Sequence, residues 1–369
     1  MRGRIGNKWV VVVGMSLLSL LSMSCTAMSG KPEIAMAASL PQEPRQVKVP
    51  VYVLEYGMPS VDVEALTLKI MDYLERGTMY HGAGEAFLDF EIYKVANAAQ
   101  LLIPTRANSD LADYEAIYFE NGVDDLCALA REGKIKQVWV WGNGHGGEMQ
   151  ETVDNGPLWQ NPRETNVPNC GVQLTTVGNH RKMPVASAIE AHIHRYEQFF
   201  SQRYRYAFNR QTAIPYAPVG AQCSGSDLDD GWGWCVEDFI TGYYGVTQAS
   251  VVGYTGSAFD SSDIAQCGWA HYPPNITWEY RLAHKDESRY VYDYTGTVLS
   301  TCRNWRLDVD EAEIAEEINC TAWGCDKPGN DNQAEYFVWW MQNIPGPNNT
   351  NYDENGNRMP NWWAALYAD

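Results

Sequence analysis

A histidine and two glutamates follow a short apolar run, in an arrangement that can bind a metal ion. The run "QVWVW" ends at residue 141, and glycines then surround His145, Glu148 and Glu151. A His-x-x-Glu pair on a turn can hold zinc together with a distant third ligand. His271, in the segment "CGWAHYPPN", is the candidate for that third ligand. The alternative is that His145 is a loop histidine after a buried strand.

A second set of candidate residues lies in residues 184–206, which have the periodicity of a long helix. Glu190, His194 and Glu197 are spaced i, i+4 and i+7, so they share one face of that helix. The set can hold a metal, or Glu190 can orient His194 as a general base, with Arg195 beside it. These four are the candidate catalytic residues of the helix. The alternative is charge pairing on a solvated helix face.

Two acidic loops offer oxygen ligands of the kind that calcium prefers. They are "DLDDG" at residues 227–231 and "DKPGNDN" at residues 326–332. Neither follows the ligand spacing of an EF-hand loop. Solvated acidic turns are the alternative, and calcium is therefore a weaker expectation than zinc.

The first set of candidates resembles the zinc site of the metallocarboxypeptidase family, in which a strand ends in His-x-x-Glu and a distant histidine completes the site. The resemblance covers the strand, His145 with Glu148, and the separation to His271. It implies a zinc-bound water that attacks a carbonyl, with a separate glutamate as base. Apart from the resemblance, Glu151 is a candidate catalytic residue because it lies close to His145 and Glu148 in the sequence. Positions that correspond to the arginine and glutamate found later in that family are not identifiable in this chain.

A longer set of segments is similar to a group of uncharacterised secreted bacterial proteins. The segments, in order, are "QVWVWG", "EAHIHRYE", "CGWAHYPPN", "EYFVWWMQNIPG" and "NWW". The resemblance implies that His194, Arg195, Glu197, His271 and Asn275 are shared positions, but it implies no activity. The His-x-x-Glu is not part of that group's pattern, so this resemblance favours a pocket near His194 and His271. We expect His271 to share a pocket with His194 or with His145.

The elements that must position these residues alternate along the chain. Apolar strands are predicted at 49–56, 87–95 and 137–141, and helices at 60–77, 123–134, 184–206 and 333–344. Continuous apolar strands that alternate with helices indicate an α/β fold with a central, largely parallel sheet and flanking helices. Such sheets bind ligands beyond the carboxyl ends of their strands, where residues 142–151 are expected.

The amino terminus has the features of an export signal. A basic start and an apolar run lead to Ser22, Ser24 and Cys25, which resemble a bacterial lipobox. The expected organisation is a signal peptide at 1–24, a flexible tether at 25–46 and a single domain at 47–369. Cleavage after residues 35–37, without lipidation, is the alternative. The protein is then bacterial and either secreted or lipid-anchored at the cell surface through Cys25.

The cysteine count agrees with export. Nine cysteines are present, and without Cys25 an even set remains, which in an exported chain suggests disulfides. The second half of the chain, with most of these cysteines, is expected to be irregular and disulfide-rich. Pairing of Cys223 with Cys235 and of Cys320 with Cys325 would close short loops. Cys127 is either a disulfide partner or a buried free thiol.

The net charge of −19 excludes a nucleic-acid partner, because such partners need basic surfaces. The 14 tryptophans and 22 tyrosines could build platforms for sugars, although such residues are more often core residues. Two functions follow. The first is an exported hydrolase, zinc-dependent or not, that acts on peptide or other acyl bonds. The alternative is a non-catalytic cell-surface protein that binds a glycan or a peptide through aromatic-rich loops.

Overall fold

In the computed structural model, all the residues that the structure describes belong to one compact unit, Glu43–Asp369. The described residues are 46–57, 62–107, 111–142, 152–157, 167–180, 185–204, 207–208, 267, 298–324 and 332–367. The predicted signal peptide and Cys25 lie outside them, as do the acidic loops at 227–231 and, apart from Asn332, at 326–332. Among the described helices, none is both long and apolar enough to cross a membrane.

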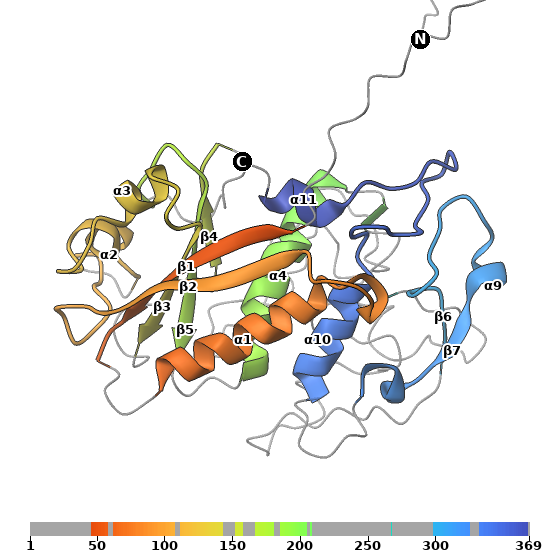
Figure 1. Cartoon of the computed structure of the whole chain (residues 1–369), viewed down its shortest axis with the longest axis horizontal. Helices are drawn as coiled ribbons and strands as arrows, with labels where there is room; N and C mark the ends of the chain where they lie inside the picture. Colours follow the sequence, from red (N-terminus) through yellow and green to blue (C-terminus); the bar gives the residue numbers. More distant parts are fainter. Residues whose placement is uncertain are drawn as a thin grey trace, which may run out of the picture. The chain divides into compact units, whose positions relative to one another are not determined.

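A five-stranded sheet organises the unit (Figure 1). Its spatial order is β2-β1-β3-β5-β4, and β1, β2, β3 and β5 are parallel, whereas β4 runs antiparallel at one edge. The strands are β1 (Val47–Glu55), β2 (Leu88–Asn97), β3 (Gln137–Gly142), β4 (Thr152–Asn155) and β5 (Leu174–His180). The prediction of a largely parallel central sheet is therefore confirmed, and the three predicted strands end within two residues of their expected positions.

Helices cover both faces of this sheet. One apolar cluster joins β1 and β3 to α1 (Val63–Gly77), α4 (Val185–Arg203), α10 (Asn332–Gln342) and α11 (Trp362–Tyr367). The other cluster joins the opposite face to α2 (Tyr114–Phe119) and α3 (Leu126–Arg131). We call these the α1/α4 face and the α2/α3 face. Shorter elements complete the described chain: η1 (Tyr80–Gly82), β6 (Val298–Ser300), α9 (Glu311–Ile314), β7 (Glu316–Ile318) and η3 (Cys320–Trp323).

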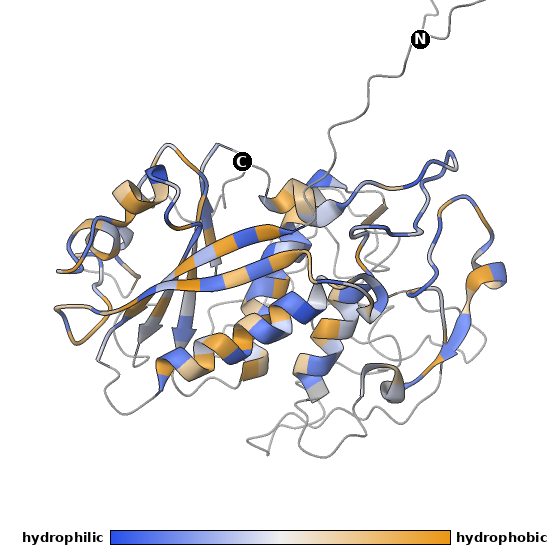
Figure 2. Ribbon diagram, in the orientation of Figure 1, coloured by the Kyte–Doolittle hydropathy of each residue, from blue (hydrophilic) through white to orange (hydrophobic). Residues whose placement is uncertain are grey.

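The alternation of side chains along each strand decides which residues meet which helices. In β1, Val51 and Val53 belong to the α1/α4 face, whereas Tyr52 and Leu54 belong to the other face. Successive strand side chains point to opposite faces, so both sets are buried only because helices cover the sheet on both sides. Figure 2 shows the corresponding bands of apolar and polar residues along β1, β2 and α1.

Capping residues define where the helices begin. The Asp62 side chain accepts a hydrogen bond from the Ala65 backbone N–H, so α1 begins at Val63. The sequence predicted that this helix starts at residue 60, which is wrong by three residues. The predicted helix at 123–134 is shorter, because Asp125 caps α3 at Leu126.

Aromatic side chains fasten the carboxyl terminus to the core. The ring of Trp362 in α11 stacks on Tyr204, with centroids 4.3 Å apart, and Trp363 lies edge-on to Tyr196 at 5.0 Å. Within the described part of the chain, every tryptophan is buried: Trp139, Trp141, Trp305, Trp323, Trp339, Trp340, Trp362 and Trp363. These rings are therefore core residues and not a binding platform.

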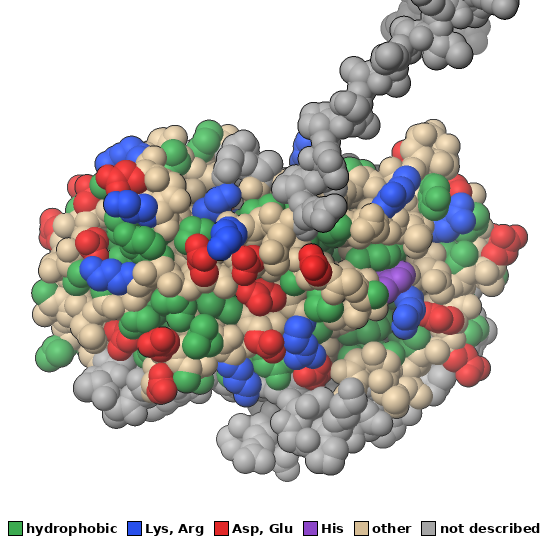
Figure 3. Space-filling view, in the orientation of Figure 1, with side chains coloured by type: hydrophobic (Ala, Val, Ile, Leu, Met, Phe, Trp, Pro, Cys, Tyr) green, Lys and Arg blue, Asp and Glu red, His purple; other side chains and the backbone are tan. Residues whose placement is uncertain are grey.

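The surface carries both signs of charge. Figure 3 shows Lys and Arg side chains interspersed with Asp and Glu over one face of the described residues. Lys48 Nζ lies 3.1 Å from Glu91 Oε2, and Lys94 Nζ lies 2.6 Å from Asp124 Oδ2. Exposed pairs of this kind contribute about 0–1 kcal/mol each, so they do not determine the fold.

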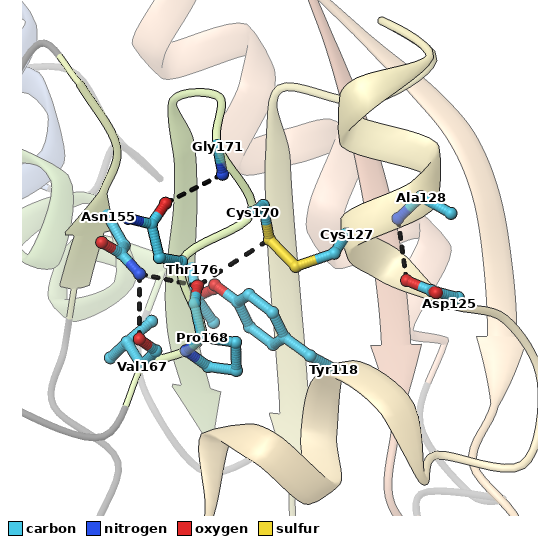
Figure 4. The surroundings of a disulfide bond; sticks show 11 residues. Tyr118, Asp125, Cys127, Ala128, Asn155, Val167, Pro168, Cys170, Gly171 and Thr176 are labelled. Atoms are coloured by element: carbon cyan, nitrogen blue, oxygen red, sulfur yellow. Dashed lines mark hydrogen bonds between the residues drawn. A yellow bond between two sulfur atoms is a disulfide. The ribbon is translucent and has the colours of Figure 1, made fainter.

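Two disulfides tie distant segments together. Cys127 in α3 bonds to Cys170, just before β5, and Cys267 bonds to Cys302. Around the first, the Asn155 side-chain N–H groups donate to the carbonyl oxygens of Val167 and Pro168 (Figure 4). The prediction that the chain contains disulfides is confirmed, although the sequence did not predict these two pairs, and Cys127 is no free thiol. Of the other expected partners, Cys223, Cys235 and Cys325 lie outside the described residues.

Replacing Cys127 and Cys170 together by alanine tests the first disulfide. The bond closes a 43-residue separation, and its loss should lower the free energy of unfolding by about 2–4 kcal/mol, because the unfolded chain gains conformational freedom. Urea unfolding without reductant measures the effect. Wild type unfolded in reductant is the control and should lose at least as much stability as the double variant, because reductant also breaks Cys267–Cys302. Alkylation of Cys127 in unreduced, denatured wild type would contradict the assignment.

Candidate functional site

Four strand ends place a row of polar side chains at the carboxyl edge of the sheet. Strand pairing sets Glu55 of β1 beside Asn97 of β2 and Trp141 of β3, and sets Trp141 beside Asn179 of β5. Within its own strand, each of these four residues lies an even number of positions from a residue of the α1/α4 face; Glu55, for example, lies two positions from Val53. Because strand side chains alternate, all four belong to the α1/α4 face. We call Glu55, Trp141 and Asn179 the edge row.

Two members of the edge row hold buried polar atoms that lack partners. Trp141 is 2 % exposed and Asn179 is 5 % exposed. Within the described residues, neither Nε1 of Trp141 nor Nδ2 or Oδ1 of Asn179 has a hydrogen-bond partner. A buried polar group left in this state costs about 1–3 kcal/mol, so native structures seldom leave one without a purpose. The edge row therefore offers two N–H donors and one amide oxygen to a ligand.

Glu55, the third member, is only partly buried, and its carboxyl group titrates abnormally. Burial raises the pKa of Glu55 above its ordinary value, and the nearby Asp62 carboxylate, which caps α1, raises it further. A carboxyl group of this kind takes up and releases a proton closer to neutral pH than an ordinary glutamate does.

The edge row lies where open parallel sheets bind ligands. In the sheet, β2 lies on one side of β1 and β3 lies on the other side. The direction in which successive strands are added therefore reverses between β1 and β3. In parallel sheets the crevice at the carboxyl ends of such strands is the usual ligand site. Glu55 and Trp141 are paired across this boundary.

All four residues predicted to form the zinc site lie outside the described residues, and three of them belong to the segment that connects β3 to β4. Gly142 ends β3 and Thr152 begins the antiparallel β4, so residues 143–151 start and finish at the carboxyl edge. His145, Glu148 and Glu151 fall within that segment and lie outside the described residues, as does His271. Their predicted convergence thus remains a prediction.

The second predicted set comes together in the middle of α4. His194 Nδ1 lies 3.2 Å from Glu197 Oε2, and His194 Nε2 lies 3.6 Å from Glu190 Oε1. The three therefore share a face, as helix geometry predicts. That face is not solvated, because Glu197 and His194 are almost fully buried and the Gln333 side chain of α10 donates to Glu190 at 3.1 Å.

This arrangement does not form a metal centre by itself. Each ring nitrogen of His194 faces a carboxylate, so the donors point at one another instead of at a common ion. No group of three His, Cys, Asp or Glu side chains among the described residues is placed to hold a metal. His194 also lies nine residues beyond Val185, the first residue of α4, or roughly 14 Å along the helix axis. The set is thus separate from the strand ends.

Arg195, predicted as a catalytic residue, forms a buried ion pair with Asp154 of β4. Its Nε donates to Asp154 Oδ2 at 2.8 Å, and its Nη1 donates to the Tyr367 hydroxyl at 3.1 Å. The Thr175 hydroxyl donates to the other carboxylate oxygen at 2.6 Å. Burial alone would lower the pKa of Arg195, but Asp154 and Tyr367 raise it above its ordinary value. The guanidinium thus stays charged and joins β4, α4 and α11.

The sequence did not point to Asp154 or to the edge row. Asp154 is one acidic residue in a four-residue strand, and nothing in its spacing marks its pairing with Arg195. Trp141 and Asn179 are distant in sequence and become neighbours only through the register of β3 and β5. The available signal was their position at the ends of apolar strands.

His192 is the second buried histidine of α4, and its environment differs from that of His194. Its ring packs on Trp139 with centroids 4.9 Å apart, and neither ring nitrogen has a hydrogen-bond partner among the described residues. Burial, followed by the positive charge of Arg195, lowers the pKa of His192 to about 3. The ring is therefore neutral at neutral pH and acts as a core aromatic residue.

The Arg195–Asp154 pair should show strong coupling. Arg195→Met leaves the Asp154 carboxylate buried without its partner, and this should cost about 3–5 kcal/mol of unfolding free energy. The double variant Arg195→Met with Asp154→Leu should be more stable than Arg195→Met alone, because no charge is left buried. Urea unfolding of the wild type, both single variants and the double variant measures the coupling. Additive losses would contradict a direct interaction.

The buried neutral His192 should make stability sensitive to acid. The unfolded chain binds a proton near the ordinary pKa of 6.5, whereas the folded protein does so only near 3. Below pH 6.5 the unfolded state therefore binds more protons, and stability should fall by up to about 1.4 kcal/mol per pH unit. His192→Phe should remove this slope. Urea unfolding of both proteins at pH 7 and pH 5 tests it, and equal slopes would contradict a neutral buried ring.

Comparisons with known proteins provide no family for this chain. No family model matches it, no curated protein matches it, and no solved structure matches it. Neither the metallocarboxypeptidase resemblance nor the similarity to secreted bacterial proteins gains support from them. The chemistry of the chain is therefore inferred from its own residues.

Proposed function

We propose that this protein is an exported hydrolase that acts on peptide or other acyl bonds, with its reaction centre at the carboxyl edge of the sheet. The observation that supports the proposal is the edge row, where a carboxyl group of raised pKa adjoins two buried N–H donors without partners. Hydrolysis of an acyl bond needs N–H donors that can bind the carbonyl oxygen. It also needs a group that can transfer a proton, such as a carboxyl group.

Residues 143–151 add further groups to this proposal. They leave and re-enter the sheet at the same edge, so His145, Glu148 and Glu151 belong to a segment that is anchored beside the edge row. In the zinc-dependent form of the proposal, His145, Glu148 and His271 hold the metal, and Glu151 serves as a base. Zinc would supply an activated water at neutral pH.

Export is supported by the disulfides. The Cys127–Cys170 and Cys267–Cys302 bonds need an oxidising compartment to form and persist. The basic and apolar residues of 1–24 are the proposed route to that compartment, and Cys25 is the proposed lipid anchor. The α4 set of Glu190, His194 and Glu197 is part of the proposal only as a secondary candidate, because its members satisfy one another.

The alternative of a non-catalytic binding protein finds less support in the described residues. That function relies on exposed aromatic rings, and the tryptophans of the described chain are all buried. Among the described aromatic residues, Tyr93 and Phe119 are exposed. A tryptophan platform for a glycan or a peptide would have to come from residues outside the described part of the chain, such as Trp232 and Trp269.

Metal content and hydrolysis together test the proposed function. Mature wild type should hydrolyse at least one member of a panel of p-nitrophenyl esters, peptide anilides and labelled casein. In the zinc-dependent form it should contain about one zinc ion per chain, and His145→Ala should lose both metal and activity. Glu132→Gln, an exposed carboxylate in a pair with Lys134, is the control and should retain both. Wild type without any hydrolysis of the panel would contradict the hydrolase.

Hydrolysis by a protein that contains no zinc would contradict only the zinc-dependent form of the proposal. In that outcome, elemental analysis finds no metal, a chelator has no effect on the rate, and His145→Ala lowers the rate without a change in metal content. The hydrolase would then work by proton transfer alone at the same edge of the sheet.

A further inference from the structure

We propose that Trp141 Nε1 and Asn179 Nδ2 bind the carbonyl oxygen of an acyl substrate, and that Glu55 is the group that transfers the proton. This inference rests on the zinc-independent form of the proposed hydrolase function and assigns its substrate contacts to residues that no sequence motif marks. The substrate class that it specifies is an uncharged amide or ester.

The geometry of the sheet brings the three groups to one place. Trp141 is paired with Glu55 on one side and with Asn179 on the other, on adjacent parallel strands and on the same face. Adjacent strands lie about 4.8 Å apart, so the three side chains start from points that span roughly 10 Å. Side chains that start this close together can contact one small ligand.

The hydrogen-bond state of the row points to an oxygen ligand. An indole N–H can only donate, so the Trp141 position requires an acceptor. Asn179 adds a second donor, Nδ2, and one acceptor, Oδ1. Two donors from neighbouring strands match the two lone pairs of a carbonyl oxygen, and the Asn179 oxygen is left to accept an N–H from an amide.

The charges near the row argue against an anionic ligand. Glu55 and Asp62 both lie at this edge, and the influence of Asp62 on Glu55 shows that they are close. A phosphate or a free carboxylate would be repelled by these two groups. A neutral carbonyl is not, because it becomes negative only as the reaction proceeds, when the two N–H donors stabilise it.

The proposed step is balanced as a hydrolysis. Glu55 accepts a proton from water while the water oxygen bonds to the carbonyl carbon, and the π electrons of the carbonyl move to its oxygen. The tetrahedral oxygen carries the negative charge between Trp141 Nε1 and Asn179 Nδ2. Its electrons then re-form the double bond, the bond to the leaving nitrogen or oxygen breaks, and Glu55 returns the proton to that leaving group.

The surroundings of Glu55 are compatible with this role. Among the described residues, Asp62 is the charged group that acts on Glu55, while its neighbours in β2 and β3 are the neutral Asn97 and Trp141. No cation in the described part of the chain is shown to pair with Glu55. The carboxyl group is therefore held near the row without a partner that would fix it in the charged state.

Asn179→Leu provides the decisive variant, because it separates a structural role from a functional one. The substitution removes polar atoms that have no partner, so it should leave the unfolding free energy unchanged or raise it. If Asn179 stabilises the tetrahedral oxygen, kcat should fall about 10²- to 10³-fold with little change in KM. Equal kcat in a folded Asn179→Leu variant would overturn the assignment.

Glu55→Gln tests proton transfer in the same assay. It should lower kcat about 10²- to 10⁴-fold and remove the acidic limb of the pH–rate profile that wild type shows. Glu91→Gln is the matched control, since Glu91 is an exposed carboxylate on the neighbouring strand, and it should leave rate and profile unchanged. A Glu55→Gln profile that keeps the acidic limb would overturn the role of Glu55.

A binding measurement distinguishes failure of this inference from failure of the hydrolase function. The indole N–H resonance of Trp141, identified by its absence from Trp141→Phe, should shift saturably when N-acetylalanine methylamide is added to ¹⁵N-tryptophan-labelled protein. Asn179→Leu should weaken that shift. A wild type that hydrolyses nothing but shows the shift loses the hydrolase function and keeps the carbonyl site. Hydrolysis without any shift at this resonance overturns the carbonyl site alone.

Discussion

The buried ion pair between Arg195 and Asp154 is the interaction on which the arrangement of the α1/α4 face depends. It joins α4 to the antiparallel edge strand, and through the Tyr367 hydroxyl it also joins both to α11. The Gln137 side chain donates to the same hydroxyl, and Trp139 donates to Gln137, so the chain of hydrogen bonds reaches the central strand β3. A charge buried to this degree requires such a set of partners, because any missing one would leave an unpaired group in a medium of low polarity.

This network explains why α4 can be buried on nearly all sides although its sequence is strongly polar. Every residue from 191 to 200 is buried, including two histidines, an arginine and a glutamate. Arg195 bonds to the sheet, and His194 lies between two carboxylates on the side toward α10. His192 packs on Trp139 in its neutral form. The polar side chains of the helix thus point in different directions, unlike those of an amphipathic helix with one polar face.

Much of the fold followed from periodicity, because strands and helices that bury their side chains carry that pattern in their own residues. The strands β1, β2 and β3 and the helices α1, α4 and α10 were predicted with small errors at their ends. Helix α2 was missed, since six residues are too few to show a helical period. In the site, the shared face of Glu190, His194 and Glu197 was predicted for the same local reason. The burial of that face was not, because it depends on α10, which is remote in sequence.

The edge row could not be predicted, because its members become neighbours only through strand register. Register is a property of pairs of segments, and a shift by one residue would turn each side chain to the opposite face. In this sheet the register sets a carboxyl group, an indole and an amide side by side at the point where the strand order reverses. Other polar residues of the described core, such as Asp154, Thr175 and Arg195, hydrogen-bond to one another. In contrast to that network, the unpaired groups of Trp141 and Asn179 lie on two neighbouring strand ends, where another molecule can complete their hydrogen bonds.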